Sequence, residues 1–325
     1  MTPLRSSPPA THPPEASLPP ETPADPRRRR LLQGGAAGLL LAAGGGVLAA
    51  TGDREALTDS LETLLQKHYR RMTPDEVAAA LARIERRARR DHDANIMCRN
   101  TPPLPEVAFG FALNLSRCKG TRRCVTACVH ENNCGRAGTL QNIRVLEMEA
   151  GRVDLTAADP YYHPEQVPAP GKGYLPVQCQ QCDDPPCVQA CPVQATWKEP
   201  DGMVVIDYDW CIGCRYCAVA CPYAARHFNW GEPWLPREAI TPETHYLGNR
   251  PRSAGVMEKC TFCLQRTRQG LLPACQEACP TGARIFGNLL DPESEIRTVL
   301  KQQRVFRLKE DLQTSPRFWY VMDGP

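Results

Sequence analysis

The chain has few aromatic residues and almost no net charge, and these shortages limit what it does. Phe, Trp and Tyr make up only 6% of the 325 residues, and the formal net charge is +3. Proteins that bind nucleic acid usually carry a strongly basic surface, so no nucleic-acid partner is expected. The sequence also lacks a glycine-rich nucleotide loop and a nucleophile paired with a base, so nothing in it indicates an active site built from side chains.

Cysteine and proline are abundant instead. The chain contains 17 cysteines and 32 prolines. Core packing does not explain so many cysteines, so metal binding and disulfides are the first explanations. The prolines favour a loop-rich domain.

Residues 1 to 50 have the composition of a leader. Residues 1 to 26 are rich in Pro, Thr and Ser and are expected to be disordered. In "RRRRLLQGGAAGLLLAAGGGVLAA" (27 to 50) a basic cluster precedes about twenty uncharged residues, the layout of an export signal. Within it "RRRLLQ" (28 to 33) is similar to the twin-arginine consensus. A membrane-spanning helix is the alternative, but six glycines weaken it, so we expect export to the periplasm through the twin-arginine pathway.

Residues 51 to 104 form a charged segment that contains one predicted helix. "MTPDEVAAALARIERRARR" opens with a capping box, in which Thr73 is the N-cap, Pro74 the first helical residue and Glu76 the capping partner. The apolar residues that recur at helical spacing are Val77, Leu81, Ile84 and Ala88. The pattern predicts an amphipathic helix that packs against the main domain.

Between residues 105 and 290 the cysteines fall into four groups, and this repetition is the signature of the fold. The groups are "SRCKGTRRCVTACVHENNC" (116 to 134), "CQQCDDPPCVQACP" (179 to 192), "CIGCRYCAVACP" (211 to 222) and "CTFCLQRTRQGLLPACQEACP" (260 to 280). The third group has the C-x2-C-x2-C-x3-C-P spacing of bacterial two-cluster ferredoxins, in which the fourth cysteine binds the other cluster. The alternation in "MVVIDYDW" (203 to 210) predicts a strand that leads into it.

Zinc and disulfides are the alternative explanations of these cysteines. Zinc takes four ligands from two C-x2-C pairs, which leaves no role for a third cysteine or for the C-P that follows. Disulfides are common in exported proteins, but cysteines at x2 spacing are poor partners for one another. Iron–sulfur clusters that are inserted before export explain the quartets better.

The region from about 105 to 325 resembles the four-cluster iron–sulfur subunits of membrane-bound respiratory oxidoreductases, such as polysulfide, tetrathionate and dimethyl sulfoxide reductases and periplasmic hydrogenases. The motifs that carry this resemblance are "QCDDPPCVQACPVQAT", "DGMVVIDYDWCIGCRYCAVACPY" and "KCTFCLQRTRQGLLPACQEACPTGARIFGNLLDPESEI". Within the last, "GARIFGNLLDPESE" looks most like the polysulfide and tetrathionate reductase branch. The resemblance implies an α+β fold of tandem ferredoxin-like units with short strands, short helices and long loops, beside the N-terminal helical segment.

The resemblance also implies a crossed pairing of the cysteine groups. Three 4Fe-4S clusters are expected on Cys179, Cys182, Cys187 and Cys221, on Cys211, Cys214, Cys217 and Cys191, and on Cys260, Cys263, Cys275 and Cys128. Cys118, Cys124 and Cys279 are left for a fourth cluster.

The fourth site lacks one ligand. Aligning "CKGTRRCVTAC" with "CIGCRYCAVAC" puts Thr121 opposite Cys214, and threonine has no sulfur to bind iron. Three outcomes remain open: a 3Fe-4S cluster, a 4Fe-4S cluster completed by another residue, or an empty site. Cys134 and Cys98 are the candidate substitutes, with His130 a weaker one. We favour the 3Fe-4S cluster because the other three cysteines are intact.

The remaining residues concern partners and the C-terminus. Pro292 to about Gln302 is predicted to be a short helix, and the tail to 325 is predicted to extend as a strap along the surface. Trp230 and Trp234 are candidates for a docking surface, because large aromatic residues are enriched at interfaces, with burial in the core as the alternative.

We expect a non-catalytic electron-transfer subunit. A self-standing reductase and a structural or assembly protein are the alternatives. The resemblance implies a quinone-reactive integral membrane subunit as one partner. The other is a catalytic subunit, either a molybdopterin enzyme or a hydrogenase, or a multihaem cytochrome of a sulfite-reductase-associated transmembrane complex.

Overall fold

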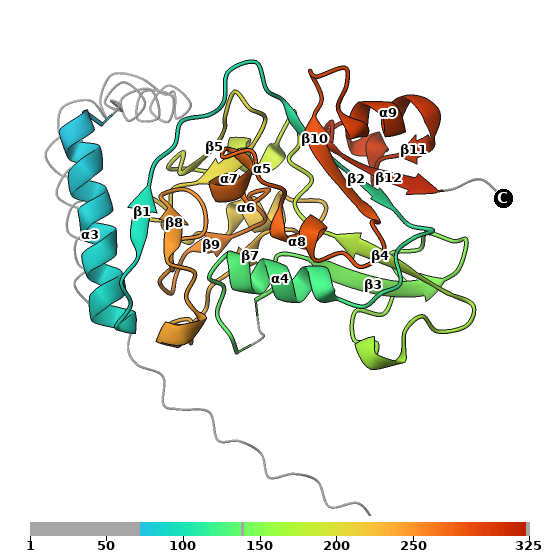
Figure 1. Ribbon diagram of the computed structural model, residues 1–325, viewed down its shortest axis with the longest axis horizontal. Coiled ribbons are helices and arrows are strands. Elements are labelled where there is room, and N and C mark those ends of the chain that lie inside the picture. Colours follow the sequence, from blue (N-terminus) through green and yellow to red (C-terminus); the bar gives the residue numbers. More distant parts are fainter. Residues whose placement is uncertain (1–71, 138–139, 323–325) are drawn as a thin grey trace, which may run out of the picture. The chain divides into compact units, whose positions relative to one another are not determined.

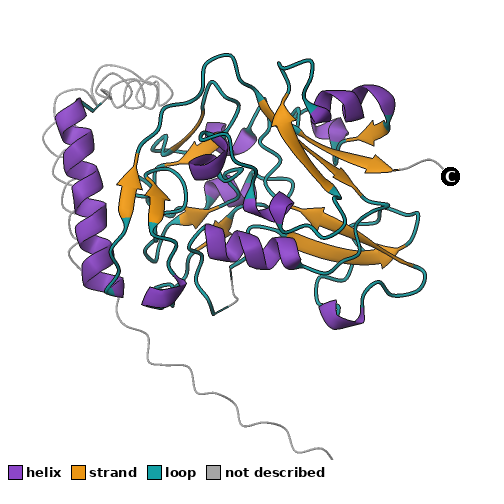
Figure 2. Ribbon diagram, viewed as in Figure 1, coloured by secondary structure: helices purple, strands orange, loops and turns teal. Residues whose placement is uncertain are grey.

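A four-stranded sheet is the largest sheet among residues 72–137 and 140–322, the parts of the chain that the computed structural model describes (Figures 1 and 2). Its strand order is β10-β2-β12-β11. The strands are β2 (Phe109–Asn114), β10 (Arg284–Asn288), β11 (Arg304–Phe306) and β12 (Phe318–Met322). β12 runs parallel to β2, and the two outer pairs are antiparallel. Every residue of β2 is buried, so this strand lies at the centre of the core.

The other strands form small two-stranded sheets between the cysteine groups. Their pairs are β1 (Met97–Arg99) with β8 (Glu243–His245), β3 (Arg144–Glu149) with β4 (Lys172–Val177), β5 (Thr196–Lys198) with β6 (Val204–Ile206), and β7 (His227–Phe228) with β9 (Met257–Glu258). Only the β1–β8 pair is parallel. This mixture of short helices and small sheets agrees with the expected α+β class. The strand predicted before the third cysteine group is present as β6, but all three of its residues are buried, so it does not alternate.

Aromatic side chains join the four-stranded sheet to the fourth cysteine group. Phe111 on β2 stacks against Phe318 on β12, with 5.1 Å between the ring centroids. Phe262, which lies between two cysteines of that group, packs on Phe111 and Phe286 at 5.7 and 5.5 Å. The sheet therefore fixes the position of a cysteine loop.

The C-terminal residues correct one prediction. The helix is confirmed as α9 (Glu295–Gln302), but the tail after it is not a strap along the surface. β12 lies between β2 and β11, and Phe318, Tyr320 and Val321 are fully buried. The apolar "FWYV" segment is a core strand because it pairs with β2, about 200 residues earlier in the chain.

The helix α3 (Pro74–His92) begins as the sequence predicts. Thr73 and Glu76 form the reciprocal capping box, with Pro74 in the first turn. Ala80, Ile84 and Ala88 are buried in the main hydrophobic core, and Val77 and Leu81 are half-buried beside them. Two arginines of the helix bond Asp209, which lies two residues before the third cysteine group: Arg83 at 3.3 Å and Arg87 at 3.5 Å.

The predicted leader, residues 1 to 50, lies outside the described residues. Within the described part of the chain, no helix has both the length and the apolar character needed to span a membrane.

A buried ion pair fastens the turn between β5 and β6 and provides a test of the fold. Asp201 is fully buried and bonds Arg268 Nε at 2.8 Å, while Arg268 also pairs with Glu199. Removing one partner leaves a buried charge without compensation, so Asp201→Ala is expected to lower the free energy of unfolding by about 3 kcal/mol. Urea unfolding under anaerobic conditions measures this. Glu149→Ala, at the exposed Glu149–Lys172 pair, should change stability far less, and equal effects would contradict this role of the pair.

Candidate iron–sulfur sites

The four cysteine groups fold into loops with the same backbone pattern. The second residue after the first cysteine has a positive φ in each loop: Gly120 (74°), Gln181 (47°), Gly213 (69°) and Phe262 (56°). The third ligand position of each group, counting Thr121 as the second position of the first group, is the second residue of a helix. These residues are Cys124 in α4 (Arg123–Glu131), Cys187 in α5 (Pro186–Gln189), Cys217 in α6 (Tyr216–Val219) and Cys275 in α8 (Ala274–Glu277). A left-handed backbone is uncommon outside glycine, so its recurrence points to one shared function.

The backbone also supports the alignment of Thr121 with Cys214. Gly120 and Gly213 precede these two residues, and both have φ near 70°. Arg122 and Arg215 follow them in the left-handed region, at 53° and 66°, as the N-caps of α4 and α6. Thr121 therefore occupies the loop position where the third group has a cysteine.

The structure brings the first cysteine group beside the fourth, and the second beside the third. Asn132 donates from one Nδ2 to the sulfurs of Cys128, at 3.5 Å, and Cys263, at 3.7 Å. A cysteine of the first group therefore lies beside the fourth group. In the same way α4 packs against α8, and α5 against α6 (Figure 1).

We name the four sets of cysteines sites A to D. Site A comprises Cys118, Cys124 and Cys279 with Thr121; site B comprises Cys128, Cys260, Cys263 and Cys275; site C comprises Cys179, Cys182, Cys187 and Cys221; and site D comprises Cys191, Cys211, Cys214 and Cys217. The cysteines of site A line one cavity, and those of site C line another. At site D, Cys191 follows α5 and Cys217 lies on α6, and these two helices pack against each other.

The cavity at site A is as large as the one formed by four cysteines at site C. Their volumes, counted with the open space at their mouths, are about 370 Å³ and about 330 Å³. Thr121 is among the residues that line the cavity of site A. The loop keeps the shape of a cluster site although one ligand type has changed.

None of the three candidate substitutes for the missing sulfur lines this cavity. Cys134 is fully buried beside Asn142, whose Nδ2 donates to its sulfur at 3.6 Å. Cys98 lies on β1, paired with Thr244 of β8, and His130 is exposed near the end of α4. In the described structure site A therefore has three sulfurs, and the geometry does not support completion by Cys134, Cys98 or His130.

Burial disfavours the ionised thiolate form of these cysteines and raises the pKa of most of their thiols. It raises the pKa of the Cys118 thiol to about 11 and that of the Cys182 and Cys260 thiols to about 12. Cys279 differs. Burial raises the pKa of its thiol, but hydrogen bonds from Thr281 and the charge of Arg284 together lower that pKa by more, so that the net shift is downward. Metal binding deprotonates a coordinating thiol outright, so buried cysteines in such sets are suited to metal ligation.

The described structure shows neither disulfides nor a convergent site for a single metal ion. All 17 cysteines are unpaired there. Within the described ranges no three Cys, His, Asp or Glu side chains converge closely enough to hold one metal ion.

Two buried arginines complete the sites, and neither was predicted from the sequence. Arg226 Nη2 donates to Cys187 Sγ at 3.0 Å, and Arg284 Nη1 donates to Cys275 Sγ at 3.6 Å. Each lies five residues after the cysteine of a C-P pair, in "CPYAARHF" and "CPTGARIF", and this repeated arginine is the signal that was available in the sequence.

Both arginines also carry N–H groups that find no acceptor within the described protein. These are Nε and Nη1 of Arg226 and Nη2 of Arg284. Buried donors normally have partners, and an anionic iron–sulfur cluster supplies acceptor sulfurs. The residues present therefore fit the clusters.

Comparison with known proteins agrees with the sites. Residues 172–235 and 246–289 match the 4Fe-4S dicluster domain, which covers groups two to four but not the group with Thr121. The iron-sulfur subunit of a putative dimethyl sulfoxide reductase from Halobacterium salinarum is 41% identical over 66% of this chain and 78% of its own length. The menaquinone reductase iron-sulfur cluster-binding subunit of Nitratidesulfovibrio vulgaris is 36% identical over 66% and 89%. A tetrathionate reductase subunit of Salmonella typhimurium is 34% identical over 67% and 73%.

The fold and the cysteine loops define a ferredoxin-type iron–sulfur protein. The chain belongs to the family of iron–sulfur electron-transfer subunits of respiratory oxidoreductases. The resemblance noted from the cysteine motifs is confirmed.

Proposed function

We propose that the chain relays electrons through four clusters, between a quinone-reactive membrane subunit and a catalytic subunit in the periplasm. The observation that carries this proposal is the series in which the sites follow one another. Arg284 lines the cavity of site A and donates to Cys275 of site B. Gln181, in the cysteine loop of site C, donates to the Cys260 carbonyl of site B at 2.8 Å. The helix α5, which carries Cys187 of site C, packs against α6, which carries Cys217 of site D. Sites A, B, C and D therefore form one continuous path.

The cysteine sets support three 4Fe-4S clusters, at sites B, C and D, and one 3Fe-4S cluster at site A. Sites B to D have four cysteines each, whereas site A has three sulfurs and an intact cavity. A three-iron cluster needs only three cysteine ligands. The clusters, when bound, accept and donate single electrons, which is the chemistry of the relay.

The protein's own residues hold the sulfurs and stabilise their charge. Cys260 Sγ accepts hydrogen bonds from Gln178 Nε2 at 3.7 Å and from the Phe262 N–H at 3.4 Å. Hydrogen bonds to sulfur and exclusion of water both tune cluster potential. No residue is required to bind a substrate, which fits an electron-transfer subunit with a separate catalytic partner.

Exposed apolar side chains lie in the third cysteine group and in the segment that follows it, and they suit the surface of a redox partner. Ile212 and Tyr216 are exposed within the cysteine group itself, and Val219 is 85% exposed. Trp230 and Trp234 are 75% and 64% exposed, so the alternative that they are buried in the core is wrong. Arg215 lies over the Trp230 ring, 4.7 Å from its centroid, which holds that ring beside site D.

The partners are proposed from the family. The quinone-reactive integral membrane subunit lies at one end of the path. At the other end lies a molybdopterin enzyme, with a hydrogenase or a multihaem cytochrome as the alternatives. The names of the relatives support a catalytic partner and a quinone-linked partner, since they include dimethyl sulfoxide, tetrathionate and menaquinone reductase subunits.

Quinol-driven reduction in membranes tests this role. In anaerobic membranes that hold the assembled complex, adding quinol is expected to bleach the visible absorption of the iron–sulfur clusters. Membranes from a strain that lacks the chain provide the baseline. Clusters that dithionite reduces but quinol does not would contradict the proposed link to quinone.

Export through the twin-arginine pathway is a separate prediction. Arg28→Lys combined with Arg29→Lys keeps the charge but removes the arginine pair, so it is expected to retain the folded chain in the cytoplasm. Arg27→Lys, just outside the consensus, is the matched control and should leave export unchanged. Cell fractionation with immunoblotting measures the distribution, and normal export of the double variant would contradict the prediction.

A further inference from the structure

Three buried cations in this chain form no ion pair with a carboxylate among the described residues: Arg226, Lys259 and Arg284. The other buried arginines are paired in the usual way. Arg268 bonds Asp201, and Arg252 lies 3.4 Å from Glu258. Because a buried charge is costly without an opposite charge, these three cations require a different anion.

Arg284 lies between sites A and B. Its side chain lines the cavity of site A together with Cys118 and Cys124, and its Nη1 donates to Cys275 of site B. Gln178 Oε1 accepts a second bond from the same nitrogen at 2.8 Å and fixes the guanidinium there. Burial lowers the pKa of Arg284, but the neighbouring thiolates of Cys124 and Cys275 outweigh burial and raise it.

Arg226 occupies the corresponding place between sites C and D. It lines the cavity of site C, bonds Cys187 and is held by the Thr196 hydroxyl at 2.9 Å. It also interacts with Cys217 of site D, whose pKa is raised by burial and lowered in part by this arginine. Thr196 lies five residues after Cys191, the same spacing that separates Arg226 from Cys221.

Lys259 lies at the remaining step, between sites B and C. The side chain is fully buried, and its Nζ donates to the Cys260 carbonyl at 2.8 Å. Gln181 Nε2, in the cysteine loop of site C, donates to the same Cys260 carbonyl at 2.8 Å, so the ammonium lies beside the loops of both sites. An ammonium has three donors, so two remain for sulfur acceptors.

We propose that Arg284, Lys259 and Arg226 are positioning residues that each serve as the shared counter-charge of two adjacent clusters, one at every step of the path. This inference rests on the proposed cluster relay and extends it. Reduction adds negative charge to a cluster, so a fixed cation in a dry site favours the reduced state and raises the potential. Since each cation faces two sites, removing it should lower both potentials of that pair and leave the distant pair unchanged.

EPR-monitored redox titration of the full chain tests this pairwise effect. Arg284→Gln is expected to lower the midpoint potential at sites A and B by at least a tenfold change in the one-electron equilibrium, about 59 mV. Arg226→Gln should leave the midpoint potential of site A unchanged and lower the midpoint potentials of the four-iron clusters at sites C and D. Lys259→Gln should lower the midpoint potentials at sites B and C. Arg226→Lys and Arg284→Lys retain the charge, so their midpoint potentials should stay close to those of the unchanged protein.

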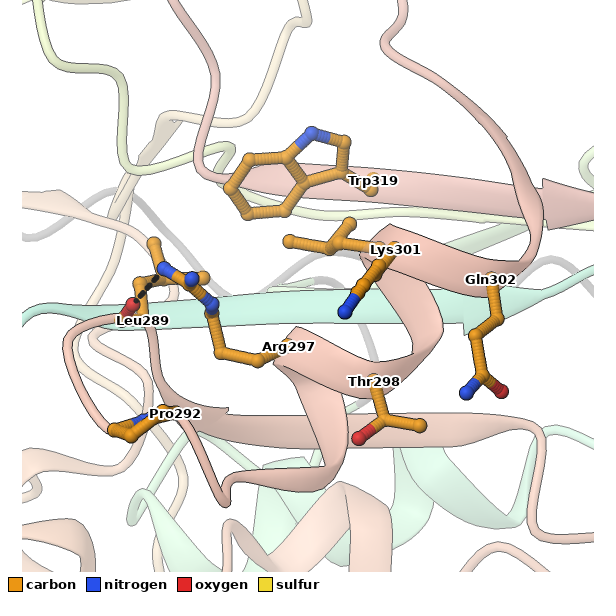
Figure 3. Close-up of a pocket in the computed structure, with 8 residues that line it drawn as sticks. Leu289, Pro292, Arg297, Thr298, Lys301, Gln302 and Trp319 are labelled. Carbon is orange, nitrogen blue, oxygen red and sulfur yellow. Dashed lines mark hydrogen bonds between the residues drawn. The ribbon is translucent and has the colours of Figure 1, made fainter.

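A surface arginine provides the matched control. Arg297 on α9 donates to the Leu289 carbonyl at 2.8 Å, beside a cavity that no cysteine lines (Figure 3). Arg297→Gln removes the same charge far from the cysteine sets and should shift no potential. Iron and sulfide content must be measured for every variant, since it shows whether each cluster is loaded.

The outcomes separate this inference from the relay on which it rests. Loaded variants with pair-specific shifts support it. Unchanged potentials in loaded Arg284→Gln and Arg226→Gln overturn it while the relay stands. Loss of iron from the Lys variants as well as the Gln variants would show that the guanidinium groups only hold the fold, and would also overturn it. Absence of iron and sulfide from the unchanged protein would refute the relay itself.

Discussion

Replacing Thr121 by cysteine is expected to convert the three-iron cluster that we propose for site A into a four-iron cluster. Thr121 occupies the loop position of Cys214, and the cavity that it lines is already as large as that of site C. The new thiolate would therefore meet the vacant corner of the cluster without rebuilding the loop. The oxidised EPR signal should disappear, because an oxidised 4Fe-4S cluster of this type is diamagnetic, and the iron content should rise by about one atom per chain.

Thr121→Ser is the control for this experiment. It keeps a hydroxyl of similar reach and adds no sulfur, so the three-iron signal should persist. An oxidised spectrum and iron content that are unchanged in Thr121→Cys would show that site A is not a three-iron cluster whose missing ligand is at this position.

Cys260→Ser is expected to interrupt the relay at its middle. Cys260 is buried in site B, where Gln178 and the Phe262 N–H bond its sulfur. A serine is a poor replacement for a thiolate ligand, so the site B cluster should be lost, with about four iron atoms per chain. In the proposed path site B joins site A to sites C and D, so quinol-driven electron transfer through the complex should stop.

Cys98→Ser is the matched control for this second experiment. Cys98 is also buried, but it lies on β1 and belongs to none of the four sites. Its replacement should change neither iron content nor electron transfer. Full iron content and normal transfer in Cys260→Ser would contradict the assignment of site B.

Local patterns in the sequence predicted the local structure well. The capping box at Thr73 and Glu76 fixed where α3 begins, because its two hydrogen bonds join residues three positions apart. Cysteine spacing revealed four equivalent loops, since each ligand set must follow the same short path around its cluster. The departure at Thr121 was visible for the same reason, and the backbone at Arg122 and Arg215 supports that alignment.

Non-local packing explains what the sequence did not show. β12 pairs with β2, and its burial on both faces depends on strands that lie far away in the chain. A short apolar run near a terminus does not by itself distinguish a core strand from a surface strap.

The buried cations were missed for a related reason. A single arginine after C-P reads as an ordinary charged residue. Only the packing of α4 on α8 and α5 on α6 places Arg284 and Arg226 between two cysteine sets each.

EPR of the anaerobically purified chain, oxidised and then fully reduced, with iron and sulfide analysis alongside, tests the central claim most directly. We predict a three-iron signal on oxidation, coupled four-iron signals on reduction, and about 15 iron atoms per chain from three four-iron clusters and one three-iron cluster. No oxidised signal, together with iron for four cubanes, would mean that another ligand completes site A. Little iron or sulfide, with zinc in their place, would contradict the assignment of an iron–sulfur relay altogether.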